Sequence, residues 1–197
     1  MYSELIQKVL SATRETKNIE FKREFDPTSR PAWCEVIKDI AAIANSGGGI
    51  IVFGLENDGS PSGENLDPLL HYDPADIANK VTSFTGTTDL AVEVVEFEKD
   101  GAQLIAFLVG ASSFPLVFEK AGHYDPKNSK GDSAFAQGTI YFRHGAKSEP
   151  ARGSDLRALI NRFLKDERKE WLSKVKKSPW HRLVHVSLQF PLRPRIH

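Results

Sequence analysis

The stretch over residues 31–55 restricts the fold of this chain more than any other. Apolar residues follow helical spacing over 33–44, and the run Asn45-Ser46-Gly47-Gly48-Gly49 must end that helix. The apolar, β-branched run over 50–55 follows at once and predicts a buried strand. A phosphate-binding loop has the reverse order and ends in Gly-Lys. We therefore expect the glycines to form a helix end and a close backbone approach, although their amides remain an alternative phosphate cradle.

The rest of the chain interleaves strands with helices. Apolar spacing predicts helices over residues 2–12, after the capping Asp73 and after the capping Ser154. Alternation predicts strands over 18–25, 90–98, 103–109, 114–118 and 139–143, one more within 180–192, a hairpin turn at 99–101 and a loop over 121–137. This order predicts an α+β fold with a mixed or antiparallel sheet packed with helices. At 197 residues, we expect one domain over 1–170 and a basic C-terminal extension over 171–197.

Composition excludes several classes of protein. The single cysteine, Cys34, excludes a disulfide framework and a zinc cage built from cysteines. The apolar runs are too short to span a bilayer, and residues 1–10 lack the pattern of a signal peptide. We therefore expect a cytoplasmic protein with no membrane partner.

The net charge of zero hides an asymmetry along the chain. Residues 162–197 carry ten Lys or Arg and three Asp or Glu, a net charge of +7, whereas residues 1–161 carry 16 and 23, a net charge of −7. A basic segment after an acidic body is typical of nucleic-acid binding, and we expect Lys174, Lys176 and Lys177 to contact the phosphate backbone. The alternative is a solvated helix that is rich in lysine.

Four charged residues are candidates for chemistry. Glu20 and Lys22 share one face of the first predicted strand, whereas Glu15 needs a bend in the chain to converge with Glu20. Carboxylates near a lysine suit a divalent-metal phosphodiesterase, because the acids hold a hard cation and the lysine stabilises charge on the phosphate. Asp58 is either a third ligand or an ordinary turn residue before a glycine. For Glu20 and Lys22, the alternative is the alternating charge that is common on a half-exposed strand.

Three stretches of the chain together resemble a known family. They are ETKNIEFK at residues 15–22, AAIANSGGGIIVFGL at residues 41–55 with Asn57-Asp58-Gly59 after it, and GTIYFRHGA at residues 138–146. In order and spacing they resemble the Schlafen AlbA-type domain, a family described as DNA-binding and earlier as a divergent AAA ATPase. The resemblance implies an α+β nucleic-acid-binding fold. Some members are metal-dependent endoribonucleases that act on tRNA through two glutamates and an aspartate, which implies roles for Glu15, Glu20 and Asp58, with Glu56 as a rival to Asp58.

The combined prediction is a nucleic-acid-binding endoribonuclease that uses Mg²⁺ or Mn²⁺ and prefers tRNA or other structured RNA to DNA. Glu15, Glu20 and Asp58 would hold the metal, and Lys22 and Arg143 would contact phosphate. Because vertebrate Schlafen cores have two lobes and this chain has one, the resemblance implies a homodimer. Two alternatives stay open: a non-catalytic DNA-binding regulator or interaction module, with structural ion pairs in place of the metal site, and an ATP-binding protein that uses the glycine turn.

Overall fold

The computed structural model describes residues 2–70, 72–128 and 130–177. The contacts within the chain divide it into two units, one that extends to Leu159 and one that begins at Ile160. The first unit contains a four-stranded sheet, a two-stranded sheet and the helices that cover them. The α+β fold predicted from the sequence is therefore confirmed.

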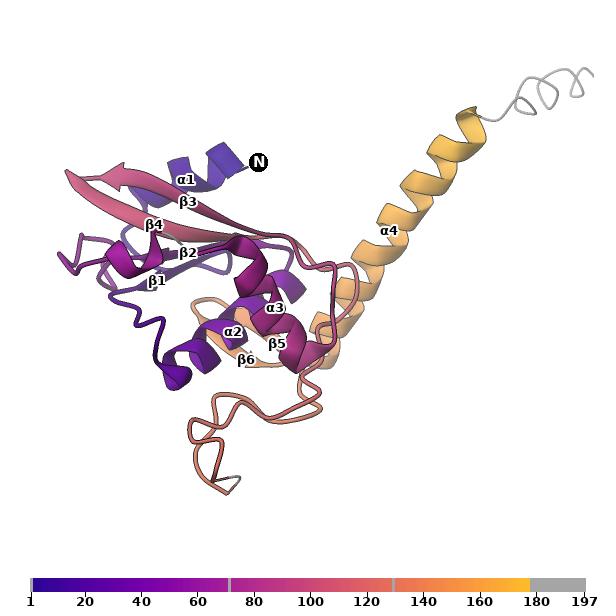
Figure 1. Ribbon diagram of the computed structural model, residues 1–197. Helices are drawn as coiled ribbons and strands as arrows, with labels where there is room; N and C mark the ends of the chain where they lie inside the picture. Colours follow the sequence, from indigo (N-terminus) through magenta and orange to yellow (C-terminus); the bar gives the residue numbers. More distant parts are fainter. Residues whose placement is uncertain (1, 71, 129, 178–197) are drawn as a thin grey trace, which may run out of the picture. The chain divides into compact units, whose positions relative to one another are not determined.

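The main sheet has the strand order β1-β2-β4-β3. Its strands are β1 (Ile19–Lys22), β2 (Gly49–Phe53), β3 (Val92–Lys99) and β4 (Ala102–Val109). β1 is parallel to β2, whereas β2–β4 and β4–β3 are antiparallel, so the sheet is mixed (Figure 1). The hairpin predicted between β3 and β4 is confirmed, with Asp100 and Gly101 at φ values of 51° and 80°.

Helix α2 (Arg30–Asn45) connects the two parallel strands and packs on one face of the sheet with α3 (Pro74–Thr85). The Ser29 side chain caps α2 by accepting a hydrogen bond from the Ala32 amide at 3.3 Å, and Asp73 caps α3 in the same way. The core on this face contains Trp33, Ile37, Ile40, Ile77, Val81, Ile51, Phe53, Ile105 and Phe107.

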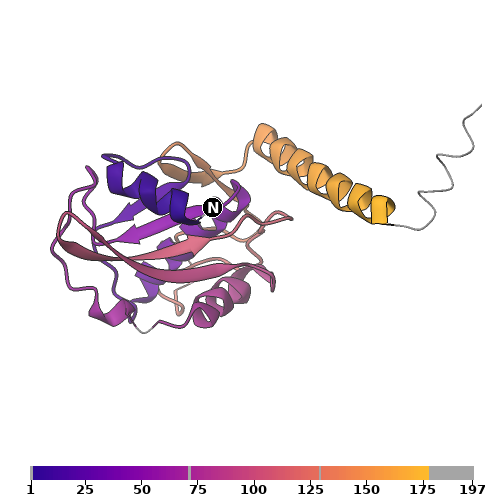
Figure 2. The ribbon, with the colours of Figure 1, turned by 90° about the horizontal axis from the view of Figure 1, so that it is seen from above.

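Helix α1 (Tyr2–Ser11) covers the opposite face of the sheet (Figure 2). Val9 is fully buried there, and Leu5 and Ile6 pack against the same core. The strand residues on this face alternate with those that face α2: Ile19, Phe21, Ile50, Val52, Leu104, Ala106 and Leu108. The apolar run of β2 is continuous because that strand is buried on both faces.

The glycine turn after α2 is a helix end and a close backbone approach. Gly47 and Gly48 have φ values of 110° and 86°, which residues with a side chain rarely adopt. A Cβ atom on Gly48 would stand 2.9 Å from the Val109 oxygen, and one on Gly49 would overlap the Asn18 oxygen. The amides of Gly47 and Gly48 donate to carbonyls of α2 at 3.2 and 2.9 Å. These two amides are engaged within the protein, which opposes the alternative of a phosphate cradle at this turn.

A second sheet pairs β5 (Tyr141–His144) with β6 (Lys147–Pro150) in antiparallel fashion and packs against α2. The sequence predicts β5 but not β6, which is short and polar. The strand predicted over 114–118 is wrong: in the described chain that segment makes one bridge, from Val117 to Ile140. The Asn45 side chain bonds both the amide and the carbonyl of Leu116, at 2.8 and 3.3 Å, and so takes the groups that a strand partner would use.

The described part of the loop predicted over 121–137 is irregular, as expected, and it contributes to the core. Phe135 is buried and stacks on Phe118 with ring centroids 3.8 Å apart. A single 3₁₀ turn, η1 (Asp67–Leu69), precedes α3 and buries Leu69.

The last helix, α4 (Gly153–Lys177), begins one residue before the predicted cap Ser154. The Asp155 carboxylate accepts a hydrogen bond from the Arg152 amide at 2.8 Å and caps the helix instead. The boundary at residue 170 stays a prediction, and the strand predicted within 180–192 lies outside the described residues. None of the helices in the described ranges combines the length and the apolar character that crossing a membrane requires.

Candidate functional site

Four charged side chains, Glu20, Lys22, Asp39 and Arg143, meet in what we call the buried charge cluster. Glu20 and Lys22 stand two residues apart on β1 and project from the same face. The Nζ of Lys22 lies 2.7 Å from Glu20 Oε1 and 2.7 Å from Asp39 Oδ2. The Nη2 of Arg143 lies 2.6 Å from Glu20 Oε2. Two acids and two bases from β1, α2 and β5 therefore neutralise one another.

The buried charge cluster is nearly closed to solvent. The exposed fraction of the side chain is 1% for Arg143, 5% for Asp39, 7% for Glu20 and 26% for Lys22. Burial, and next the Asp39 carboxylate, raise the pKa of Glu20 from 4.5 to about 7, although Lys22 and Arg143 oppose the change. Burial alone would lower the pKa of Lys22, but the carboxylates of Asp39 and Glu20 outweigh burial and raise it. Lys22 is therefore a permanent cation, whereas Glu20 titrates near neutral pH.

Arg143 links β5 to the rest of the cluster. Its amide donates to Ser46 Oγ at 2.8 Å, and its Nη1 donates to Ser148 Oγ at 3.3 Å. The ion pair with Glu20 is close but poorly aligned, since Glu20 Oε2 and Arg143 Nε have no hydrogen-bond partner among the described residues. Because the guanidinium is buried, the predicted contact between Arg143 and a nucleic-acid phosphate has no support in this fold.

The structure contains the bend that the Glu15 prediction requires. Thr16 and Ile19 exchange backbone hydrogen bonds of 2.9 and 3.4 Å, which reverse the chain just before β1. The Oε1 of Glu15 then accepts a hydrogen bond from the Phe21 amide at 3.0 Å. The Glu15 carboxylate thus reaches the backbone of β1 next to Glu20.

Asp58 stays within its own turn. Its Oδ1 accepts hydrogen bonds from the Ser60 hydroxyl at 2.6 Å and the Ser60 amide at 2.9 Å, and these bonds lower the pKa of Asp58. Across the described residues, three or more His, Cys, Asp or Glu side chains are nowhere grouped so as to hold a metal ion. Glu20 and Asp39 do converge, but the Lys22 amine bonds to both. As they lie, the acids do not fit a divalent cation.

Asp39 is the member of the cluster that sequence reasoning misses. It follows the buried Val36 by three residues and precedes the buried Ile43 by four, so helical spacing places it on a buried face. A carboxylate at such a position needs a partner of opposite charge, and this pattern is the signal that could have identified it.

Lys22 borders a cavity of about 650 Å³ beside α2. The cavity is also lined by four acids: Glu24, Asp26, Glu35 and Glu64. Such a lining attracts cations and repels phosphate. The contact between Lys22 and phosphate therefore stays a prediction.

The predicted lysines of the basic segment lie on α4. Lys174 is exposed and pairs with Glu170 at 2.6 Å. Lys176 and Lys177 are in the last turn of the helix, and their side chains lie outside the described part of the structure. Their contact with a nucleic-acid backbone stays a prediction.

Comparison with known proteins finds a family match over most of the chain. The family model described as Schlafen, AlbA_2 matches residues 15–152, a range that contains both sheets and the buried charge cluster.

Individual proteins show lower similarity. The uncharacterized ATP-binding protein UU034 of Ureaplasma parvum serovar 3 is 23% identical over an alignment of 185 residues, gaps included. The match covers 85% of this chain and 50% of that protein. The chain thus spans about half the length of this curated relative. The crystal structure of the DIP2311 protein from Corynebacterium diphtheriae aligns with a TM-score of 0.49 and 16% identity, over 76% of this chain and 29% of that chain.

Proposed function

The chain belongs to the Schlafen AlbA_2 family, and from this premise we propose that it binds nucleic acid through the basic segment after the matched domain. The observation that carries the proposal is the charge asymmetry, with +7 over residues 162–197 and −7 over residues 1–161. Within α4, Lys and Arg outnumber Asp and Glu by eight to four. Concentrated positive charge favours a polyphosphate chain, because binding releases the counterions condensed on it.

The dependence of affinity on salt tests this proposal. We expect wild-type protein to bind fluorescein-labelled RNA or DNA with an affinity that falls steeply as salt rises. Replacing Lys174, Lys176 and Lys177 with Gln should make the slope of log affinity against log salt concentration shallower by about 2 to 3, because each lost phosphate contact contributes about 0.7 to 0.9. The matched control replaces three loop lysines, Lys120, Lys127 and Lys130, with Gln. If both variants lose the same affinity and the same salt dependence, binding depends on the net charge of the protein and not on the basic segment.

Metal-dependent cleavage of RNA, in preference to DNA, is the finer part of the proposal. Its support is that acids occupy all three positions implied by the family and that Glu15 folds back onto β1 beside Glu20. The turn bonds of Asp58 and the position of Lys22 oppose it. Mg²⁺ or Mn²⁺ would need these side chains to rearrange, so we assign no catalytic step to a metal. The rival function is a non-catalytic, DNA-binding regulator.

Cleavage is tested with end-labelled tRNA, single-stranded RNA and DNA in Mn²⁺, with and without EDTA. Glu15→Gln and Asp58→Asn remove two candidate ligands without touching the buried charge cluster, and Glu93→Gln on β3 is the control. Discrete products that EDTA and both variants abolish would support the nuclease. If wild type binds nucleic acid in a salt-dependent way but yields no product, the protein is a non-catalytic binding module and the acids have only a structural role.

A homodimer belongs to the same proposal. Four large apolar side chains are exposed on α4: Ile160, Leu164, Trp171 and Leu172. Self-association would cover this apolar surface. Light scattering over a concentration series should show a mass near twice 21.9 kDa, and Trp171→Glu should lower it. A constant monomer mass at every concentration would exclude the dimer.

ATP binding is the last candidate, and its support is the name of the Ureaplasma parvum relative. The glycine turn opposes it, because the amides of Gly47 and Gly48 already bond to α2. A rise in melting temperature with ATP would revive this candidate, and an unchanged melting temperature would remove it.

A further inference from the structure

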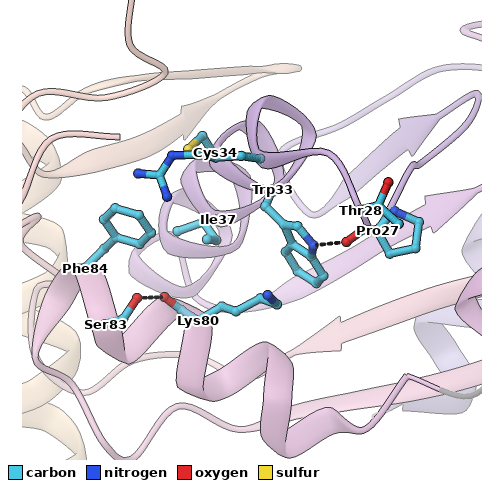
Figure 3. A pocket seen from close by; sticks show the side chains of 9 residues that line it. Pro27, Thr28, Trp33, Cys34, Ile37, Lys80, Ser83 and Phe84 are labelled. Carbon is cyan, nitrogen blue, oxygen red and sulfur yellow. Dashed lines mark hydrogen bonds between the residues drawn. The ribbon is translucent and has the colours of Figure 1, made fainter. Parts of the chain in front are cut away.

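A cavity of about 310 Å³ lies where α2 and α3 pack together (Figure 3). Helix α2 lines it with residues 30, 33, 34 and 37, and α3 lines it with residues 80, 83 and 84. Spacings of three and four place each set on one stripe of its helix, so the helices themselves hold the walls in place. Four of the lining side chains are charged or aromatic: the cations Arg30 and Lys80 and the rings of Trp33 and Phe84.

The two cations face this cavity without acidic partners. Among the residues that the structure describes, neither Arg30 nor Lys80 has a carboxylate within ion-pair distance. Arg30 Nε donates to the His123 carbonyl at 3.0 Å, which holds the side chain in place, and its terminal nitrogens make no hydrogen bond to the described residues. Two positive charges therefore meet at one cavity and lack an anion.

Each cation lies against an aromatic ring. Lys80 Nζ is 4.7 Å from the centroid of Trp33, and Arg30 Cζ is 6.0 Å from that of Phe84. A ring orients a cation but does not neutralise it. Trp33 is held by its Nε1 hydrogen bond of 2.8 Å to the Pro27 carbonyl, and Phe84 packs edge-on against Phe135 at 5.2 Å. The rings are therefore rigid walls.

The acids of this region line the neighbouring cavity. Glu35 bonds to Lys38 and Tyr124, and the Asp26 carboxylate bonds to Thr28. Glu35 and Asp26 both line the cavity of about 650 Å³ beside Lys22. One face of α2 thus borders the acidic cavity, and the adjacent face borders the basic, aromatic cavity. An anion is therefore attracted to the basic, aromatic cavity.

We propose that the basic, aromatic cavity binds one nucleotide unit of a single-stranded or looped nucleic acid, with the phosphate on Arg30 and Lys80 and the base against Phe84. This inference rests on the proposed function and specifies its substrate class. The volume of the cavity, about 310 Å³, is near the lower limit for ligand cavities, which is about 300 Å³. This volume suits one unstacked nucleotide and excludes a paired duplex. Arg30 offers a planar pair of donors to phosphate, and Lys80 offers a point charge. Stacking on an aromatic ring accepts any base, so binding is tolerant of sequence.

The test compares four ligands: a short single-stranded RNA, a single-stranded DNA, a duplex of equal length, and AMP as a free nucleotide. Arg30→Gln/Lys80→Gln removes the two cations, and Phe84→Leu removes the ring but keeps an apolar side chain. Lys127→Gln/Lys130→Gln, in the exposed loop, removes the same two charges elsewhere and is the matched control. Melting temperatures verify that each variant folds.

We expect tighter binding of single strands than of the duplex. The Arg30/Lys80 double variant should weaken single-strand binding about tenfold or more. It should lower the slope of log affinity against log salt by about 0.7, because both cations contact one phosphate. Phe84→Leu should weaken it by about 5- to 100-fold and leave the salt slope unchanged. Different effects on the salt slope would separate the phosphate contact from the stacked base.

Four outcomes overturn one or both proposals. If the cavity variants bind nucleic acid as tightly as the control variant does, the proposal for the cavity is wrong but the proposed function stands. Equal affinity for the duplex and the single strand would have the same meaning. Binding of AMP without binding of any nucleic acid would support the cavity chemistry but overturn the proposed function. Binding of none of the four ligands would overturn both.

Discussion

Replacing Glu20 with Gln tests whether the buried charge cluster makes stability depend on pH. Glu20 is 7% exposed at its side chain and lies between Lys22 and Arg143. Gln has the shape of protonated Glu and does not titrate, so the substitution removes one ionisation with little change in packing.

The magnitude follows from the raised pKa of Glu20. The folded state holds the proton up to about pH 7, whereas the unfolded chain releases it near 4.5. The stabilising effect of the proton is complete below 4.5 and is lost as the pH rises through 7. At about 1.4 kcal/mol per pH unit, the free energy of unfolding of wild type should fall by about 3 kcal/mol relative to Glu20→Gln across this range.

The assay is urea unfolding followed by far-UV circular dichroism at several values between about pH 5 and pH 8. The difference between Glu20→Gln and wild type should grow with pH, whereas Glu93→Gln, an exposed position on β3, should follow wild type. Parallel curves for wild type and Glu20→Gln would contradict this prediction, because they would show that Glu20 does not titrate in this range in the folded protein.

Three further substitutions test the packing around the site by urea unfolding. Arg143→Ala leaves Lys22 as the one cation of the buried charge cluster, beside the two carboxylates of Glu20 and Asp39, and should cost about 3 to 5 kcal/mol. A loss near zero would contradict the buried ion pair. Gly49→Ala places a Cβ atom against the Asn18 carbonyl and should cost about 1 to 3 kcal/mol, and full stability would mean that β1 can move away. Phe135→Ala removes the ring stacked on Phe118 and should cost about 3 to 5 kcal/mol. A loss of about 0.5 kcal/mol or less, as at a surface position, would show that Phe135 does not pack on Phe118.

The elements whose causes are local could be predicted from the order of the amino acids alone. The caps at Ser29 and Asp73, the stop after α2 and the turn at Asp100-Gly101 each depend on residues a few positions apart. Periodicity and turn chemistry operate over the same short range, so they can be read directly along the chain. The motif order was also sufficient to place the chain in its family, over residues 15–152.

Which polar groups are buried, and what they bond to, depends on contacts that form when the whole chain folds. The strand predicted over 114–118 is absent because Asn45, from α2, takes the hydrogen-bonding groups of Leu116. Glu20 and Lys22 read as an exposed pair on β1, but α2 and β5 cover them and bring Asp39 and Arg143 into contact. Such contacts join residues far apart in the chain, and no local preference encodes them. Burial then changes what the same side chains do, because a charge removed from water must find a partner of opposite charge.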